Sequence, residues 1–269
     1  MIEYASNRVP LKRLCETGGV LAVITQILGT SYRNLGTMMA FGPQGQRTGS
    51  LSSGCIEDDI AEHAATALKT GEVRLLRYGQ GSPFFDLKLP CGGGLSILLI
   101  PNPDLTILQA ILARGDDRSE AVLRINLSTG ALALLLGGQT SAAPDEVIIV
   151  LEPELRFWVY GHGIEAMSFA LMAQAAGYDV TLFFHDHENE ARLLAQFLPS
   201  DAVFIGAQGS LKARQRLLAD LRDQSVTEAH IARLCPTFGL IGSCRDPRTL
   251  AVSVLAHVLS LAGPAVQAY

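Results

Sequence analysis

The sequence has little charge, few cysteines and no long hydrophobic run. Only 17% of its 269 residues are charged, and 26 acidic residues outnumber 21 basic ones. The net charge of −5 gives no positive field for a phosphate backbone, so we expect no nucleic-acid partner. The best apolar stretches, Val20–Leu28 and Leu95–Ile100, are far too short to cross a bilayer, so no membrane contact is expected. Residues 1–16 lack the apolar core of a signal peptide.

The five cysteines are too few and too scattered for a disulfide framework. They stand at positions 15, 55, 91, 235 and 244, and none forms a C-x-x-C pair. An odd number of unpaired thiols indicates a reducing compartment, so we expect a cytoplasmic protein. The apolar fraction of 48% in turn predicts packed cores rather than disorder. A chain of this length is expected to form two domains, 1–144 and 145–269.

The first domain is predicted to be mixed α+β. Apolar, β-branched runs bounded by turn residues predict strands at 20–28, 36–41, 47–51, 73–78 and 95–100. Acids in the first turn and a glycine after the last predict a helix over 56–69, and a second helix is expected over 105–114. The segments 121–126 and 131–136 read as a hairpin.

The second domain is predicted to be α/β. Strands at 156–160, 179–184 and 202–205 alternate with helices ending near 176, 197 and 222, and a last helix is expected over 247–261. This alternation predicts a parallel, three-layer αβα sheet. The segment Gly161-x-Gly163-x-x-Ala166 lies between the first strand and its helix, the context of a loop that holds a pyrophosphate. A tight turn that binds nothing is the alternative.

Two cysteines flanked by glycines are the strongest candidates for chemistry. Cys55 follows Gly54 at the start of a predicted helix, where the helix dipole favours the reactive thiolate. Cys91 precedes Gly92-Gly93-Gly94, whose successive N–H groups can form a nest for an anion. A packed thiol remains the alternative for Cys55, and a plain turn the alternative for the triple glycine.

Two further segments carry weaker patterns. His185-Asp186-His187-Glu188 suggests a metal site, but neighbouring residues at a strand end point apart, so a helix start is favoured. Gly206–Ser210, followed by Lys212 and Arg214, suits either an anion site at a helix start or a plain strand–helix turn.

Together these motifs resemble the XdhC/CoxI family. The resemblance runs through most of the chain, in the segments 29–33, 49–57, 86–94, 159–163, 202–210, 236–242 and 246–256. It implies a Rossmann-like second domain and a cytosolic homodimer. It also implies a chaperone, rather than a turnover enzyme, that binds the molybdenum cofactor as molybdopterin or its cytidine dinucleotide form. The expected client is xanthine dehydrogenase or a related molybdenum hydroxylase, with a cysteine desulfurase supplying sulfur in some members.

The resemblance assigns roles to ten residues. Thiolates suit the molybdenum or sulfur end of the cofactor, and glycine N–H groups suit its phosphate. The expected cofactor-binding residues are Cys55, Cys91, Gly54, Glu57, Gly92, Gly93, Gly94, Arg33, Gly161 and Gly163, with Cys55 and Cys91 as the ligands that approach the metal.

The second domain departs from the family. It is shorter after its second strand, Phe184 stands where a ribose-binding acid is expected, and Thr249 and His257 replace the family's usual acids. NAD(P) is therefore not expected. An NAD(P)-dependent oxidoreductase remains the main alternative function, and a scaffold that docks a molybdenum hydroxylase is the third.

Overall fold

The chain divides into two compact units, residues 2–154 and 155–268. The computed structural model describes residues 6–52, 54, 56–80, 82, 92–161, 163–183 and 190–262, without the side chains of 182 and 183. The division lies later than the expected boundary at 144/145. The reason is that β9 (Glu146–Leu151) pairs along its whole length with β6 (Ala121–Asn126) and so belongs to the N-terminal unit.

The N-terminal unit is built on a five-stranded sheet with the order β3-β2-β1-β5-β4, in which all neighbours are antiparallel. Its strands are β1 (Val20–Leu28), β2 (Met38–Phe41), β3 (Arg47–Gly49), β4 (Arg74–Gly79) and β5 (Gly94–Pro101). The five predicted strands are confirmed, with small shifts at their ends.

Both faces of the central strand β1 are buried over Val20–Ile24, which explains the apolar run at its start. Val20, Ala22 and Ile24 pack in a core with α2 (Glu57–Thr70), the helix predicted from its acidic first turn. The alternate residues Leu21 and Val23 belong to a second core on the other face. Successive side chains of a strand point to opposite faces, so β1 joins the two cores.

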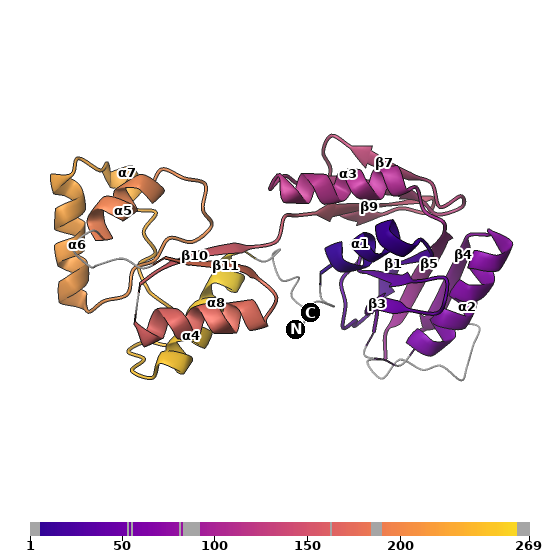
Figure 1. The fold of residues 1–269 in the computed structure, drawn as a ribbon, viewed down its shortest axis with the longest axis horizontal. Coiled ribbons are helices and arrows are strands. Elements are labelled where there is room, and N and C mark those ends of the chain that lie inside the picture. The colour runs from indigo at the N-terminus through magenta and orange to yellow at the C-terminus, as the bar shows by residue number, and fades with distance from the viewer. Residues whose placement is uncertain are drawn as a thin grey trace. The chain divides into compact units, whose positions relative to one another are not determined.

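The second core is covered by two helices and a second sheet. The helices are α1 (Arg8–Thr17), which was not predicted, and α3 (Leu105–Asp116), which was; Figure 1 shows them near one another above the first sheet. The sheet has the order β7-β6-β9-β8, with β7 (Leu132–Leu135) and β8 (Ser141–Ala142) as its outer strands. Antiparallel pairing of β6 with β7 confirms the predicted hairpin.

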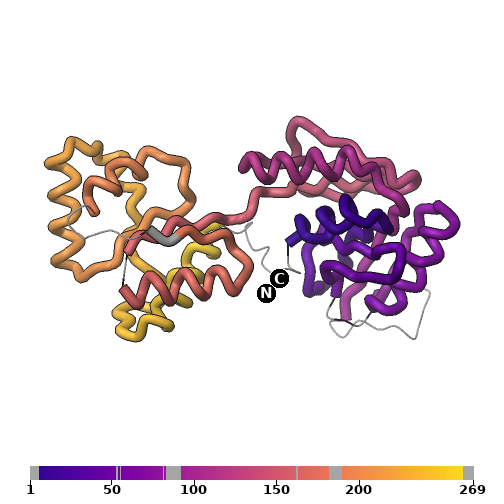
Figure 2. The backbone as a smooth tube through the Cα atoms, in the orientation of Figure 1, coloured from indigo at the N-terminus to yellow at the C-terminus, as the bar shows by residue number. Residues whose placement is uncertain are grey.

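The C-terminal unit begins with a βαβ element. The strands β10 (Arg156–Tyr160) and β11 (Asp179–Phe183) pair in parallel and are connected by α4 (Ile164–Ala175). The helix α8 (Pro247–Ala262) packs against α4, although the two are far apart in the sequence; the salmon helix and the yellow helix of the tube in Figure 2 lie side by side. A separate core holds α5 (Glu190–Phe197), α6 (Leu211–Asp223) and α7 (Glu228–Ile231).

The parallel sheet of this unit is smaller than predicted. Residues 202–205 were expected to form a strand, but within the described residues only Ile205 pairs, in an isolated parallel bridge with Leu234. The guanidinium of Arg233 donates instead to the carbonyl oxygens of Leu198 and Ala202, at 3.1 and 2.9 Å. Of these two carbonyl groups, only that of Ala202 belongs to the expected strand. None of the described helices is long and apolar enough to span a membrane.

Candidate functional site

Two of the family-like segments lie side by side at one end of the first sheet. Leu28, the last residue of β1, pairs with Gly94, the first residue of β5. The Gln80 N–H donates to the carbonyl oxygen of Gly93 at 3.0 Å. A methyl group added to Gly93 would overlap the carbonyl oxygen of Thr30. The turn that follows β1 and the glycine run that precedes β5 therefore touch through their backbones.

Arg33 connects this turn to the segment before α2. Its Nε donates to the carbonyl oxygen of Ser50 at 3.0 Å. The Ser50 hydroxyl in turn donates to the Glu57 carboxylate at 3.2 Å and to the carbonyl oxygen of Ser52 at 2.5 Å. Arg33, predicted to bind the cofactor, thus joins two of the family-like segments, 29–33 and 49–57.

Glu57, the first residue of α2, binds the loop that precedes this helix. Its side chain is buried, with 7% of the residue exposed. The carboxylate accepts hydrogen bonds from the Ser52 N–H at 2.7 Å, the Ser52 hydroxyl at 2.6 Å and the Ile56 N–H at 3.3 Å. Burial by itself raises the pKa of Glu57, but the hydrogen bonds from Ser52 and Ile56 outweigh it, and the net pKa lies below its ordinary value. Glu57 is therefore ionised at neutral pH and satisfied within its own loop.

Gly54 and Gly92 are the open positions of this region. Their φ angles are +91° and +72°, which side chains rarely adopt, and both residues are exposed. Among the residues that the structure describes, no atom lies within 4 Å of a Cβ built at either position. Gly93 and Gly94, in contrast, are buried, and a Cβ on Gly94 would lie 2.5 Å from the Gln80 carbonyl oxygen. The first two glycines leave room for another group, whereas the other two allow the backbone to pack.

The two cysteines of the predicted site, Cys55 and Cys91, lie outside the described residues, each next to one of these open glycines in the sequence. The described thiols, Cys15, Cys235 and Cys244, are all partly buried. Burial, with a smaller contribution from Glu16, raises the pKa of Cys15. Within the described residues, no three Asp, Glu, His or Cys side chains gather as a metal site would require.

The C-terminal unit places Gly161 and Gly163 as predicted, between β10 and α4. Gly161 has a φ of +149°, and a Cβ there would lie 3.2 Å from the Cβ of Ala166, so glycine allows the strand and helix to meet closely. Gly163 is the N-cap residue of α4. The predicted strand–loop–helix context is confirmed.

A cavity of about 380 Å³ lies beside this loop. Its walls include seven aromatic residues from β10, α4, α5 and the later loops: Phe157, Trp158, Tyr160, Phe169, Phe197, Phe204 and Phe238. This cavity could not be predicted from the sequence, because its rings come from segments without a common period. The one available signal was Trp158 and Tyr160, which stand two apart on one face of β10.

The lining of this cavity does not fit a dinucleotide. The described lining residues with a formal charge are Glu165 and Glu190, and no lysine or arginine is among them. The Glu165 carboxylate lies over the loop, since a Cβ on Gly163 would be 2.8 Å from its Oε2. A pyrophosphate on this loop would face a carboxylate instead of a cation. His162, Phe184 and the segment 185–188 lie outside the described residues.

The segment Gly206–Ser210 forms a turn with an internal cap. The Ser210 hydroxyl accepts from the Ala213 N–H at 3.2 Å at the start of α6. Arg214 donates to the carbonyl oxygens of Cys235 and Leu234, at 2.9 and 3.3 Å. The Ser210 cap and the Arg214 guanidinium thus bind backbone groups of the chain itself, as expected for a plain strand–helix turn.

Comparisons with known proteins agree with the two-part organisation. The profile of the XdhC and CoxI family matches residues 16–79, and that of the XdhC Rossmann domain matches residues 165–258. The chain is 30% identical over 265 residues to the molybdenum cofactor insertion chaperone PaoD of Escherichia coli, covering 91% of this chain and 83% of PaoD. A probable component of the xanthine dehydrogenase of Bacillus subtilis is 49% identical over 41 residues, which are 15% of this chain and 12% of that protein.

The fold also matches a solved structure. A crystal structure described as a xanthine dehydrogenase from Bacillus halodurans superimposes with a TM-score of 0.77 and 20% identity, covering 95% of both chains. It agrees with a mixed N-terminal unit followed by a Rossmann-type unit. With the two profile matches and the identity to PaoD, it follows that the chain belongs to the XdhC and CoxI family.

Proposed function

We propose that the chain binds the molybdenum cofactor with its N-terminal unit and delivers it to a molybdenum hydroxylase such as xanthine dehydrogenase. The name of PaoD, a molybdenum cofactor insertion chaperone, supports this role. The observation that carries the proposal is the meeting of the family-like segments at one end of the first sheet, with open glycines at Gly54 and Gly92. The proposal holds for the cofactor with or without its cytidine nucleotide.

The residues of this region divide into two roles. Cys55 and Cys91 would supply soft thiolates for the molybdenum or sulfur end of the cargo. The open backbone at Gly54 and Gly92 would let the cargo approach, and N–H groups near Gly92 would face its phosphate. The remaining predicted residues, Arg33, Glu57, Gly93 and Gly94, would shape the loops rather than touch the cargo, since their described contacts lie within the fold.

The setting of this activity is also part of the proposal. On the resemblance to the family, we place the chain in the cytoplasm as a homodimer, with a cysteine desulfurase as the source of the cofactor's sulfur. An NAD(P)-dependent oxidoreductase is less well supported, because Glu165 and Glu190 line the cavity beside the glycine loop.

Cofactor retention tests the proposal. The full chain is purified without oxygen from cells that make the cofactor, and bound molybdenum and the fluorescence of the oxidised pterin are measured. We expect Cys55→Ser and Cys91→Ser to retain several-fold less of both, while Cys15→Ser and Cys244→Ser, at partly buried thiols outside this region, retain as much as the parent. Equal retention by all four variants and the parent would refute the cysteine assignment.

Delivery is tested separately with a cofactor-free molybdenum hydroxylase as acceptor. The loaded parent is expected to restore hydroxylase activity faster than free cofactor at the same molybdenum concentration. If the chain binds the cofactor but never accelerates this recovery, it stores the cofactor and does not insert it.

A further inference from the structure

The aromatic side chains that line the cavity of the C-terminal unit suit a flat ring as ligand. Phe197 makes an edge contact with Trp158 and a tilted contact with Tyr160, with ring centroids 5.7 and 5.5 Å apart. Phe204 and Phe238 form a second ring pair on the cavity wall, with centroids 6.4 Å apart. Aromatic walls favour flat, apolar or cationic ligands through stacking and cation–π contacts.

The polar groups of the cavity select the charge of its ligand. Glu165 and Glu190 stand in the first turns of α4 and α5, where a free helix N-terminus would otherwise receive an anion. Gln208 adds a neutral side chain that can both donate and accept. With carboxylates in these places and no lysine or arginine among the described lining residues, an anionic group is repelled and a ring N–H or ring cation is attracted.

The size of the cavity agrees with a small ligand. Its volume of about 380 Å³ is near the lower end of the range for small-molecule sites. The floor is apolar and comes from α8, where Ala251, Val254 and Val258 line it. A ring system fits such a floor, because its desolvation costs little.

We propose that this cavity binds a small nitrogen heterocycle, uncharged or positively charged, that carries no phosphate. The ring stacks among Trp158, Tyr160 and Phe197, and its N–H groups or positive charge face the carboxylates of Glu165 and Glu190. The Rossmann-type loop is retained for the close contact of Gly161 with α4 and not for a pyrophosphate. The proposed site uses residues of the C-terminal unit alone and none of the N-terminal residues proposed to hold the molybdenum cofactor. It can therefore be tested independently of the chaperone function.

Trp158 gives a direct readout of the proposed site. It is the single tryptophan of the chain, and it lines the cavity. The full chain is titrated with two matched pairs of probes, adenine against AMP and 1-methylnicotinamide against NAD⁺. Each pair shares one ring, to which the second member adds ribose and phosphate, and NAD⁺ adds a second base as well. Saturation of the change in tryptophan emission separates binding from collisional quenching, and calorimetry gives an independent affinity.

We expect adenine or 1-methylnicotinamide to bind saturably, and its phosphorylated counterpart to bind at least about tenfold more weakly. Phe197→Ala should weaken the bound ring by about tenfold. Glu165→Gln should weaken 1-methylnicotinamide several-fold and reduce the discrimination against AMP and NAD⁺. Asp223→Asn, at an exposed acid on α6, is the matched control and should change neither.

Two results would overturn the proposal. One is an absence of saturable binding of both unphosphorylated probes at millimolar concentration. The other is NAD⁺ or AMP binding at least as tightly as its unphosphorylated counterpart. If Phe197→Ala does not fold, Glu165→Gln still tests the proposal, because Glu165 lines the cavity. Its substitution must change the affinity for the unphosphorylated probe and for its phosphorylated counterpart by different factors.

Discussion

Ser52 donates both its backbone N–H and its hydroxyl to the carboxylate of Glu57, at 2.7 and 2.6 Å. The loop that precedes α2 is thereby folded back onto the first residue of the helix that follows it. A buried carboxylate is tolerated only with such partners, because its desolvation is otherwise costly. This pair ties Ser52, on the N-terminal side of Gly54, to the first residue of α2.

Glu57→Gln is expected to lower the free energy of unfolding by about 1–3 kcal/mol. The amide that replaces one carboxylate oxygen is a donor, and it would face the donors of Ser52 and Ile56. Urea unfolding of the full chain measures the change. Glu62→Gln, at an exposed acid on the same helix, is the control and should stay within about 0.5 kcal/mol of the parent. Equal stability of the two variants would show that the Glu57 contacts contribute nothing.

The same carboxylate makes stability depend on pH. The pKa of Glu57 is lower in the folded chain than in the unfolded chain, because the hydrogen bonds to its charged form outweigh its burial. The stabilisation is therefore complete above the ordinary glutamate pKa of about 4.3 and is lost as the pH falls through the folded value. We expect the difference in midpoint temperature between the parent and Glu57→Gln to be constant near neutral pH and to shrink in acid. A difference that grows with falling pH would contradict the lowered pKa.

Gly93→Ala is expected to be more destabilising than Gly92→Ala. A methyl group on Gly93 would overlap the Thr30 carbonyl oxygen, so β1 and β5 would have to separate at this end. Gly92 has room for a methyl group, and its alanine variant carries only the strain of a φ of +72°, roughly 1–2 kcal/mol. Thermal unfolding of the two variants measures the order. If Gly92→Ala is the less stable of the two, close approach of the backbone is not the reason for glycine at position 93.

The strands of the N-terminal unit could be predicted because their pattern is local. Val20–Ile24 is apolar throughout, and both of its faces are buried in the structure. The helix Arg8–Thr17 was not predicted from the sequence. It buries only Pro10, Leu11 and Leu14 and begins at an N-cap, Asn7, that makes no side-chain cap bond. Leu11 and Leu14 keep helical spacing and Gly18 follows the last residue, but no cap bond marks the start of the helix.

The candidate site could likewise be predicted only in part. The glycine motifs were identified from the sequence, and their meeting follows from the pairing of β1 with β5, which local sequence does not specify. The roles of Glu57 and Arg33 could not be predicted either, since both depend on which backbone groups the loops bring near. The expected strand at 202–205 is reduced to an isolated bridge between Ile205 and Leu234, a pairing that local sequence does not specify.

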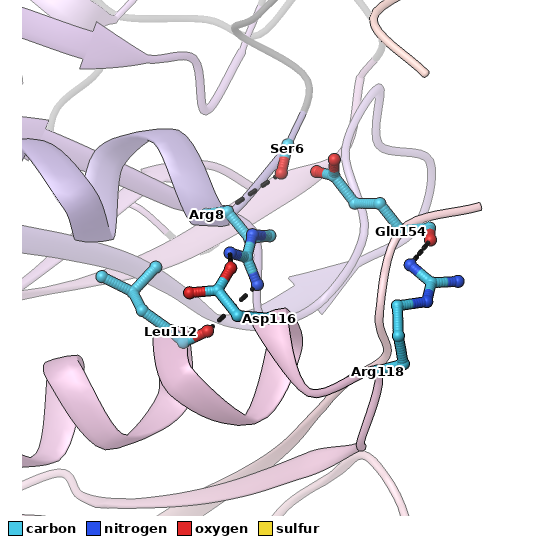
Figure 3. A network of polar contacts seen from close by, with 6 residues as sticks. All are labelled: Ser6, Arg8, Leu112, Asp116, Arg118 and Glu154. Carbon is cyan, nitrogen blue, oxygen red and sulfur yellow. Dashed lines mark hydrogen bonds and ion pairs between the residues drawn. The ribbon is translucent and has the colours of Figure 1, made fainter. Parts of the chain in front are cut away.

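Arg8→Met is expected to destabilise the N-terminal unit by about 1 kcal/mol. Arg8 lies on α1 and donates to the Leu112 carbonyl oxygen at 3.3 Å and to the Asp116 carboxylate at 2.5 Å, both near the C-terminal end of α3 (Figure 3). A cation at this end offsets the negative pole of the helix, and its hydrogen bonds join the two helices. Methionine keeps the apolar stem and removes both contacts.

The matched control for this variant is Arg13→Met on the same helix. Arg13 pairs with Glu16 at 3.4 Å, and both side chains are about half exposed, so its loss should cost less than about 0.5 kcal/mol. Urea unfolding at low and high salt separates the two contributions. Salt should remove most of the small Arg13 effect by screening, whereas part of the Arg8 effect should survive because its hydrogen bond to the Leu112 carbonyl is not an ion pair. Equal costs for the two variants would mean that the Arg8 contact at the end of α3 adds nothing beyond a surface charge.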